Sequence, residues 1–456
     1  MQTQSANTLE HDSKKTAPLS LHARASGRSL KMLGVAALVG IQSFTAGEAI
    51  AQSSSHPDSV SPLKPNPYIK HQDPWRWDVR TQVFLRAGFI GRFNGEFREE
   101  LSGSWDIENF QYIFPLVRQG GHYWTPNEEF TTSLRIDDDE YVPEPEVLFT
   151  EETRSPYLWW RSNAVTDHVN QLHVIQTTHV VSASTKFDES KAKQIPWPDS
   201  WSTEATKFLA PIIDRVDKPI DTKGQDRLIE LLDQWIEGND PKSIDQVTLA
   251  KFLTGKVIEH VRIVHGSIAS RASSRVLFNQ EFRDGLTNLS NGFSGLAVRS
   301  ADQIALEPAG SRLDLSSMLT SVLRAAGIPA RTVVCYNNNV FIEEGDRIQA
   351  IVEFALYDEQ NDQILWIPID VEKLLDNGRR SAYYEQPWDY FGNHDELNFY
   401  VPLAHYFHPQ ANYQAYAFPG LYGFRAQPDI GNRVTQRILI EVNNTASRGD
   451  DPVRKP

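Results

Sequence analysis

The sequence predicts an α+β protein in which an N-terminal β-sandwich precedes a mixed helix–strand core. Three observations lead to this prediction. Between Trp75 and about Ser184, short apolar segments alternate with glycine- and proline-containing turns, as in all-β sandwiches. From about residue 228 the apolar residues recur at helical spacing instead. Between 313 and 370 one helix is followed by three strands.

The composition narrows the class of protein. The 456 residues include 45 Lys and Arg against 59 Asp and Glu, which gives a net charge of -14. This balance argues against a nucleic-acid partner, since phosphate binding needs a basic face. A single cysteine excludes a disulfide framework and a Cys-rich metal site. No apolar run reaches the 18 or so residues that a membrane helix needs, so no integral membrane span is expected.

Residues 1–51 resemble a secretory signal peptide in their pattern. Basic residues precede an apolar run, Met32–Ile41, and a small-x-small site ends at Ala51. We expect cleavage after Ala51 and export to the periplasm or the outside of the cell. An N-terminal anchor or a core helix is the alternative, and the true start could be Met32. Residues 52–66 are Ser/Pro-rich and predict a flexible segment, and we assign 52–73 to a linker.

Residues 74–195 are expected to form the β-sandwich. Segments 79–85 and 171–182 are the clearest strand candidates. The acidic run Asp137–Glu140 lies between two such segments. It could be a calcium loop, but the ligand spacing of a known calcium loop is missing, so we interpret it as a solvated turn.

Residues 196–425 are expected to form the α+β core. Pro- and Trp-rich residues 196–201 mark its start, and amphipathic patterns predict helices over 228–236 and 244–261. A strand is predicted over 433–442, within a C-terminal strand and tail that we assign to 426–456.

The most informative segment is 310–331. Its apolar residues Leu315, Met318, Leu319, Val322, Leu323 and Ala326 follow the spacing of one buried helical stripe. Gly327 suits the left-handed position beyond the helix end, and Pro329 prevents its continuation. Strands are then predicted over 332–336, 347–357 and 363–369, the last two as a hairpin.

This segment resembles the transglutaminase-like superfamily, whose core is related to papain. The family motif Leu-Arg-Ala-x-Gly-Ile-Pro-Ala-Arg is matched throughout by Leu323–Arg331. Gly310 and Asp314 match the family's Gly-x-Cys-x-Asp at the expected distance. Further matches are Ala350 with Glu353, and Trp366–Asp370. The resemblance implies a papain-like α+β core with a Cys-His-Asp triad.

Two of the three triad positions depart from the family. The alignment places Arg312 at the cysteine position and Gln349 at the histidine position, and only Asp370 is retained. A guanidinium cannot attack a carbonyl, and an amide cannot shuttle protons at neutral pH. We therefore expect no catalytic residues, and a vestigial triad at Arg312, Gln349 and Asp370.

The sequence contains other possible nucleophiles and metal ligands. Cys335 is the sole thiol, and its place in a strand favours a buried small hydrophobe. Ser311 adjoins the nucleophile position but would need a distant histidine as its base. His405 and His408 could form a metal pair, but no third ligand lies at metal spacing, so neither a metal nor a cofactor is expected. Three histidines among strand residues are interpreted as structural or exposed: His168, His173 and His179.

A cation at a helix N-terminus costs roughly 0.3–1 kcal/mol unless it is paired. Arg312 should therefore have a carboxylate partner, for which Asp314 and Asp370 are the candidates. In one interpretation, a structural bridge between Arg312 and its carboxylate partner would fill an inactive site. Alternatively, the guanidinium and the helix amides would form a groove for a carboxylate or a peptide, lined by Asp314 and Trp366.

These features predict an exported pseudoenzyme that binds a peptide or protein, or supports an assembly. The alternative is an active acyl-transferring or amide-hydrolysing enzyme of the same superfamily with a relocated nucleophile. A third reading is that the β-sandwich binds a surface or a glycan while the core is a spacer.

Overall fold

The computed structural model describes most of the chain from residue 66 to residue 445. The described ranges are 66–93, 96–101, 103–126, 130–149, 156–162, 166–209, 222–263, 301–342, 347–359, 361–405, 421–428 and 434–445. All of them belong to the compact unit Asp58–Pro456. The expected signal peptide lies outside the described residues, and the linker is described only from residue 66.

Long strands with alternating apolar residues build the first sheet. Its strands, in spatial order, are β19 (Val434–Asn444), β1 (Ile69–Phe93), β11 (Gln171–Phe187), β6 (Phe130–Ile136) and β7 (Asp139–Tyr141). The neighbouring strands are antiparallel, and β2 (Glu96–Leu101) and β5 (Tyr123–Trp124) pair with β1 and β11. The acidic run Asp137–Glu140 is exposed: Asp137 and Asp138 form the expected turn, with Asp137 at positive φ, whereas Asp139 and Glu140 begin β7.

A second antiparallel sheet packs against the first. Its order is β18 (Gly423–Gln427), β4 (Asn109–Pro115), β9 (Pro156–Ser162) and β8 (Glu146–Phe149). A small ladder joins β3 (Trp105–Ile107) to β10 (Thr166–Val169). Val83 and Val174 of the first sheet share one buried core with Tyr112 and Trp160 of the second, which is the arrangement of a β-sandwich.

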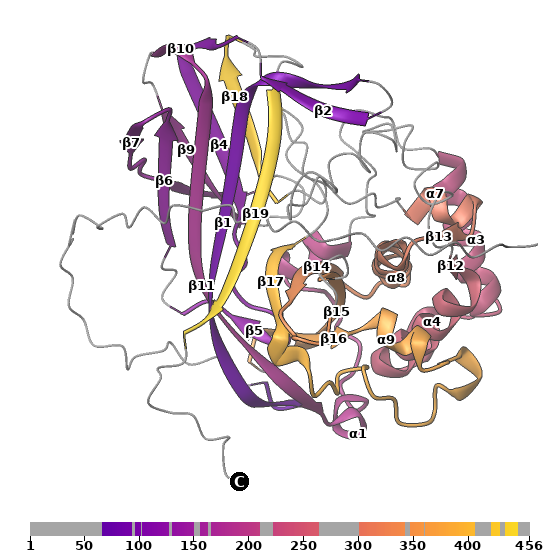
Figure 1. The fold of residues 1–456 in the computed structure, drawn as a ribbon. Coiled ribbons are helices and arrows are strands. Elements are labelled where there is room, and N and C mark those ends of the chain that lie inside the picture. Colours follow the sequence, from indigo (N-terminus) through magenta and orange to yellow (C-terminus); the bar gives the residue numbers. More distant parts are fainter. Residues whose placement is uncertain are drawn as a thin grey trace, which may run out of the picture. The chain divides into compact units, whose positions relative to one another are not determined.

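The C-terminal strands complete both sheets of this sandwich. β18 pairs with β4, and β19 pairs with β1 over eleven residues from Val434 to Asn444. Strands from the two ends of the sequence therefore lie side by side (Figure 1). Local sequence patterns predicted the last strand, but they carried no information about its partner.

The third sheet belongs to the α+β core. Its antiparallel order is β16 (Gln363–Ile369), β15 (Ile348–Asp358), β14 (Ala330–Asn337) and β17 (Tyr400–His405). The helices are α1 (Glu189–Ala192), α2 (Thr203–Thr206), α3 (Thr222–Trp235), α4 (Gln246–His260), α7 (Ala301–Leu306), α8 (Arg312–Ala325) and α9 (Val371–Asp376). The remaining short elements are the 3-10 turns η1 (Lys207–Leu209), η2 (Pro241–Ser243), η4 (Ser381–Tyr383) and η5 (Leu397–Phe399), and the parallel pair β12 (Arg262–Ile263) and β13 (Ala309–Gly310).

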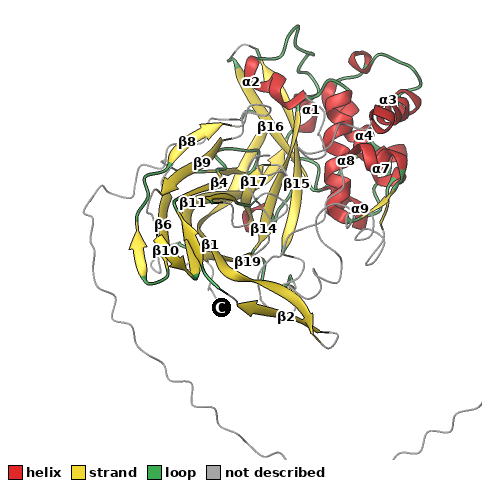
Figure 2. Cartoon of the chain, turned by 90° about the horizontal axis from the view of Figure 1, so that it is seen from above, coloured by secondary structure: helices red, strands yellow, loops and turns green. Residues whose placement is uncertain are grey.

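The core sheet lies between the helices and the sandwich. Val352 and Phe354 share a buried cluster with α4 and α8, whereas Val333 and Ile351 belong to the cluster of the sandwich. Figure 2 shows α4 and α8 on one side of β14–β16. The mixed architecture confirms the predicted α+β class. The domain boundaries drawn from the sequence stay predictions.

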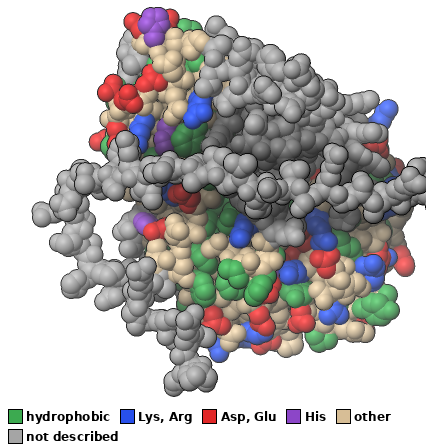
Figure 3. Space-filling model, in the orientation of Figure 1, with side chains coloured by type: hydrophobic (Ala, Val, Ile, Leu, Met, Phe, Trp, Pro, Cys, Tyr) green, Lys and Arg blue, Asp and Glu red, His purple; other side chains and the backbone are tan. Residues whose placement is uncertain are grey.

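No described helix is long and apolar enough to cross a membrane. On the described part of the face in Figure 3, acidic and basic side chains are interspersed over the helical region.

Candidate functional site

The N-terminus of α8 is the position where the family motif places a nucleophile. Ser311 is the N-cap: its hydroxyl accepts from the Asp314 amide (3.2 Å), while the Asp314 carboxylate accepts from the Ser311 amide (2.8 Å). A Cβ at Gly310 would collide with the Asp314 carboxylate, so this capping box requires glycine there. The buried Asp314 serves the helix start.

Arg312 has a carboxylate partner, as expected, but from an unexpected element. Its guanidinium donates two parallel hydrogen bonds, of 2.9 and 2.8 Å, to Asp376 at the end of α9. The sequence predicts Asp314 or Asp370 as this partner, and the structure shows Asp376. The side chains of Arg312 and Asp376 are 37% and 49% exposed, so this bridge lies at the surface.

Gln349 occupies the family's histidine position at the start of β15. Its Oε1 accepts from Asn337 Nδ2 at 2.9 Å. α8 packs on the other face of the sheet, where Thr320 contacts Thr332 at 2.8 Å. Because side chains alternate along a strand, Gln349 shares the face of Glu353 and not that of α8. The structure therefore directs Gln349 and Arg312 to different faces of the core sheet.

Asp370, the third family position, is buried and fully engaged. It caps α9 by accepting from the Lys373 amide, and its other oxygen accepts from His394 Nε2 and Tyr400 Oη, all at 3.0 Å. Burial opposes ionisation of Asp370, but the hydrogen bonds from His394, the Lys373 amide and Tyr400 outweigh it and lower the pKa. Asp370 is therefore a carboxylate.

His394 supplies the imidazole that the sequence alignment did not find. Its backbone pairs with Thr185 of β11 in an isolated antiparallel bridge, which positions the loop beside Asp370. Its Nδ1 accepts from the Glu396 amide at 3.2 Å, so the proton is assigned to Nε2, which donates to Asp370. Both ring nitrogens are thus occupied, and the side chain is buried. The only signal in the sequence was an isolated histidine in a loop 24 residues after Asp370.

Cys335 lies on β14 opposite Gln349 and is completely buried, which confirms its expected environment. Burial raises the pKa of the thiol well above its usual value, and the charges of Glu353 and Asp370 raise it further. The sulfur is therefore a thiol at neutral pH, and a thiol is a far weaker nucleophile than a thiolate.

Trp366 belongs to a buried ionic cluster that joins the core to the sandwich. The Arg331 guanidinium stacks 3.9 Å from the Trp366 ring and pairs with Glu353 at 2.7 Å. Glu353 also accepts from the Gly121 amide at 2.6 Å, and Arg331 donates to the Gln119 carbonyl at 2.6 Å. A Cβ on Gly121 would approach Pro368 within 2.7 Å, so glycine allows this close contact.

The remaining histidines do not assemble a metal centre in the described part of the chain. His405 contacts the Tyr123 hydroxyl, and His408 lies outside the described residues. His173 bonds to Gln82 and His179 to Asp78, while the exposed His168 contacts Ser104. No three His, Cys, Asp or Glu side chains among the described residues are placed to hold a metal.

Comparison with known proteins confirms the resemblance of the core. Residues 283–371 match the family model of the transglutaminase-like superfamily. No curated protein matches the sequence. A candidate cysteine protease from Cytophaga hutchinsonii is similar at 12% identity and a TM-score of 0.45, over 83% of this chain and 93% of that one. A candidate protease from Parabacteroides distasonis has 10% identity and a TM-score of 0.19, over 60% of this chain and 47% of that one. No argument rests on these two structural likenesses.

Proposed function

With a transglutaminase-like core over residues 283–371, we propose that the protein is an exported, catalytically inactive member of that superfamily which binds a peptide or protein, or supports an assembly. The observation that carries the proposal is Arg312. This residue stands where the family has its nucleophile, and its guanidinium is tied to Asp376.

Two further observations support the absence of catalysis. The sole thiol, Cys335, is buried and kept protonated by its surroundings. The imidazole beside Asp370 has its basic nitrogen occupied by the Glu396 amide, so accepting a proton would cost that hydrogen bond. Nucleophilic catalysis needs a reactive atom and a free base within reach of one another.

The test is an assay of amine incorporation and peptide hydrolysis by the purified protein. The proposal predicts that the protein and its Cys335→Ser variant both stay at the no-protein background. Turnover that Cys335→Ser abolishes would overturn it.

An active enzyme with a relocated nucleophile is the second candidate, and the Asp370–His394 pair is the observation that favours it. Such an enzyme would lose turnover in the His394→Ala variant. The control is His179→Ala, which alters a half-exposed histidine paired with Asp78 and should keep the turnover. Equal background rates for the wild type and both variants would dispose of this candidate.

Binding by the altered site can be tested separately, with peptides that carry a free or an amidated C-terminus. If Arg312 receives a carboxylate, Asp376→Asn removes a competing carboxylate from the guanidinium and strengthens binding of the free acid, whereas Arg312→Ala weakens it. Isothermal titration measures both. Equal affinity of the wild type and the two variants would show that the ligand binds elsewhere.

Export predicts a defined mature N-terminus. A secreted chain processed after Ala51 begins at Gln52. Cell fractionation and N-terminal sequencing check this, and an unprocessed chain in the cytoplasmic fraction would contradict it.

A further inference from the structure

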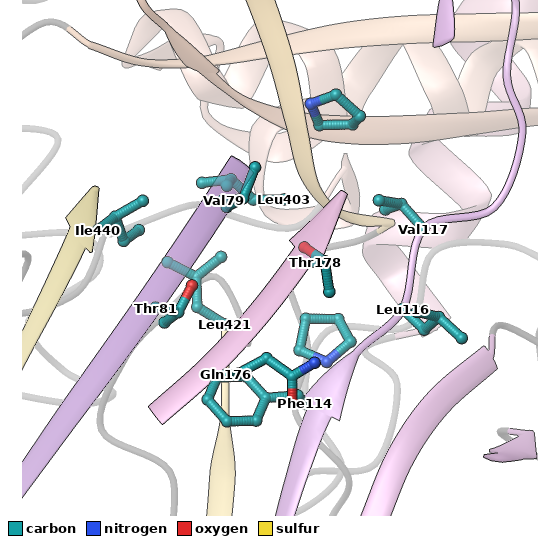
Figure 4. Close-up of a pocket in the computed structure, with 12 residues that line it drawn as sticks. Val79, Thr81, Phe114, Leu116, Val117, Gln176, Thr178, Leu403, Leu421 and Ile440 are labelled. Carbon is teal, nitrogen blue, oxygen red and sulfur yellow. The ribbon is translucent and has the colours of Figure 1, made fainter. Parts of the chain in front are cut away.

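A small cavity lies where the two sheets of the sandwich meet strand β17 of the core (Figure 4). It has about 30 Å³ of free space for water-sized molecules. Its lining is mostly apolar and comes from five strands and the segments beside them: Val79, Thr81, Phe114, Pro115, Leu116, Val117, Gln176, Thr178, Pro402, Leu403, Leu421 and Ile440. The hydroxyls of Thr81 and Thr178 and the amide of Gln176 are the polar side-chain groups of this lining.

Gln176 is the feature of the cavity that calls for an explanation. The residue is only 4% exposed, and in the described structure neither Oε1 nor Nε2 has a hydrogen-bond partner. It follows Leu172 and Val174 on the inward face of β11, where an apolar residue would normally stand. An unsatisfied buried polar group is unfavourable, so an amide with two such atoms calls for a partner that the described residues do not supply.

Size and chemistry together identify that partner. A water occupies about 10–15 Å³ by this measure, so the cavity has room for about two. No charged side chain lines it, so a charged ligand would be buried without a counter-charge. We propose that this cavity is an internal hydration site in which about two ordered waters satisfy the Gln176 amide.

This hydration site is independent of the proposed function. The site places polar groups within the apolar interior of the sandwich, where Leu403 of the core strand β17 packs against the sandwich. A buried water commonly makes about three hydrogen bonds, and the Thr81 and Thr178 hydroxyls are within the same lining to supply the others.

High-resolution crystallography of the full protein tests the proposal directly. The expected result is one or two solvent peaks about 2.7–3.2 Å from the Gln176 amide atoms. A cavity without solvent density, or a Gln176 amide turned onto a protein partner, would overturn the proposal. This observation on the wild type decides the matter even if a variant fails to fold.

A solution measurement uses Gln176→Met, which keeps the length of the side chain and removes its polar atoms. Relaxation dispersion of ¹⁷O-water should show a loss of about two long-lived waters. The matched control is Gln82→Met, because Gln82 is similarly buried at 8% exposure but accepts from His173 at 3.0 Å. The control should keep the long-lived waters and lower the Tm. An unchanged water count in Gln176→Met would contradict the proposal.

Discussion

Two arginines in this core pair with carboxylates, but the two ion pairs differ greatly in burial. The side chains of Arg331 and Glu353 are 5% and 0% exposed, whereas Arg312 and Asp376 are at the surface. Truncating one partner of a buried pair leaves an uncompensated charge in a medium of low dielectric constant. An exposed pair leaves a charge that water solvates. The buried Arg331 belongs to the family motif, and the exposed Arg312 is the residue that the sequence analysis aligns with the family's cysteine.

The first prediction compares these two residues. Arg331→Ala should lower the free energy of unfolding by about 3–5 kcal/mol, because Glu353 is left buried and unpaired. Arg312→Ala should change it by at most about 1 kcal/mol. Urea denaturation of the two variants measures both values. Equal losses would show that the Arg331–Glu353 cluster does not hold the core to the sandwich.

The second prediction concerns the sole thiol. Cys335 is buried and its pKa is raised, so a thiol reagent should not react with the native protein. After unfolding in guanidinium chloride, one thiol per chain should react. Rapid labelling under native conditions would show that the thiolate is accessible and would favour an active enzyme.

At the scale of elements, the C-terminal strand β19 is an integral part of the sandwich. It covers β1 along eleven residues, and Ile438 and Ile440 are buried in the common core. Residues 434–444 therefore form the edge strand of the first sheet, next to the strand of residues 69–93. This pairing also means that cutting the chain near residue 196 would not yield two intact halves.

The third prediction follows from this pairing. A chain that stops after Pro428 lacks β19, so it exposes the edge of β1 and loses apolar burial. It should aggregate or lose its cooperative unfolding transition in size-exclusion and thermal measurements. A chain that stops after Thr445 keeps β19 and serves as the control. Normal folding of the shorter chain would show that β19 contributes little.

Local elements were predictable from the sequence because near neighbours determine them. The helix expected near 313–326 is α8 (Arg312–Ala325), and the strands expected over 347–357 and 363–369 are β15 and β16. Gly327 has φ 83°, as the predicted helix end requires. Periodicity and capping chemistry act within a few residues, and the sequence displays both.

Long-range placements were not predictable in this way. His394 reaches Asp370 through a loop held by Thr185, and Arg312 meets Asp376 because α8 and α9 pack together. Neither contact leaves a trace in local spacing. The alternation of β15 directs Gln349 away from α8, which only the arrangement of the sheet reveals. The motif therefore identified the core, but only the structure shows which residues contact Arg312 and Gln349.

Across the whole molecule, burial lowers the pKa of several histidines, so these side chains are neutral in the folded protein near neutral pH. Burial lowers the pKa of His122 to about 3, although its hydrogen bond to the Tyr400 carbonyl acts in the opposite direction, and the charge of Arg331 lowers the pKa further. The His122 Nδ1 lies 3.9 Å from Glu353. Burial also lowers the pKa of His71, His260 and His405.

The fourth prediction is a loss of stability in acid. A histidine whose folded pKa lies below its unfolded value of about 6.5 binds fewer protons when folded. Its stabilising contribution is therefore present above about pH 6.5 and is lost as the pH falls toward 3. For His122 the loss is on the order of a few kcal/mol. Urea denaturation between pH 7.5 and 4.5 should show a falling free energy of unfolding.

His122→Gln isolates the contribution of one residue. Glutamine can still donate to the Tyr400 carbonyl, which His122 Nε2 contacts at 3.3 Å, but it does not titrate. The slope of stability against pH should therefore become shallower than in the wild type. A steeper or unchanged slope would mean that His122 is not neutral in the folded protein.

Turnover of amine and peptide substrates by the full mature protein is the decisive measurement of whether this core is inactive. If Arg312 has replaced the nucleophile of a transglutaminase-like core without a substitute, the wild type, Cys335→Ser, Ser311→Ala and His394→Ala should all remain at the background rate. Turnover by the wild type that any one of these substitutions removes would contradict the account.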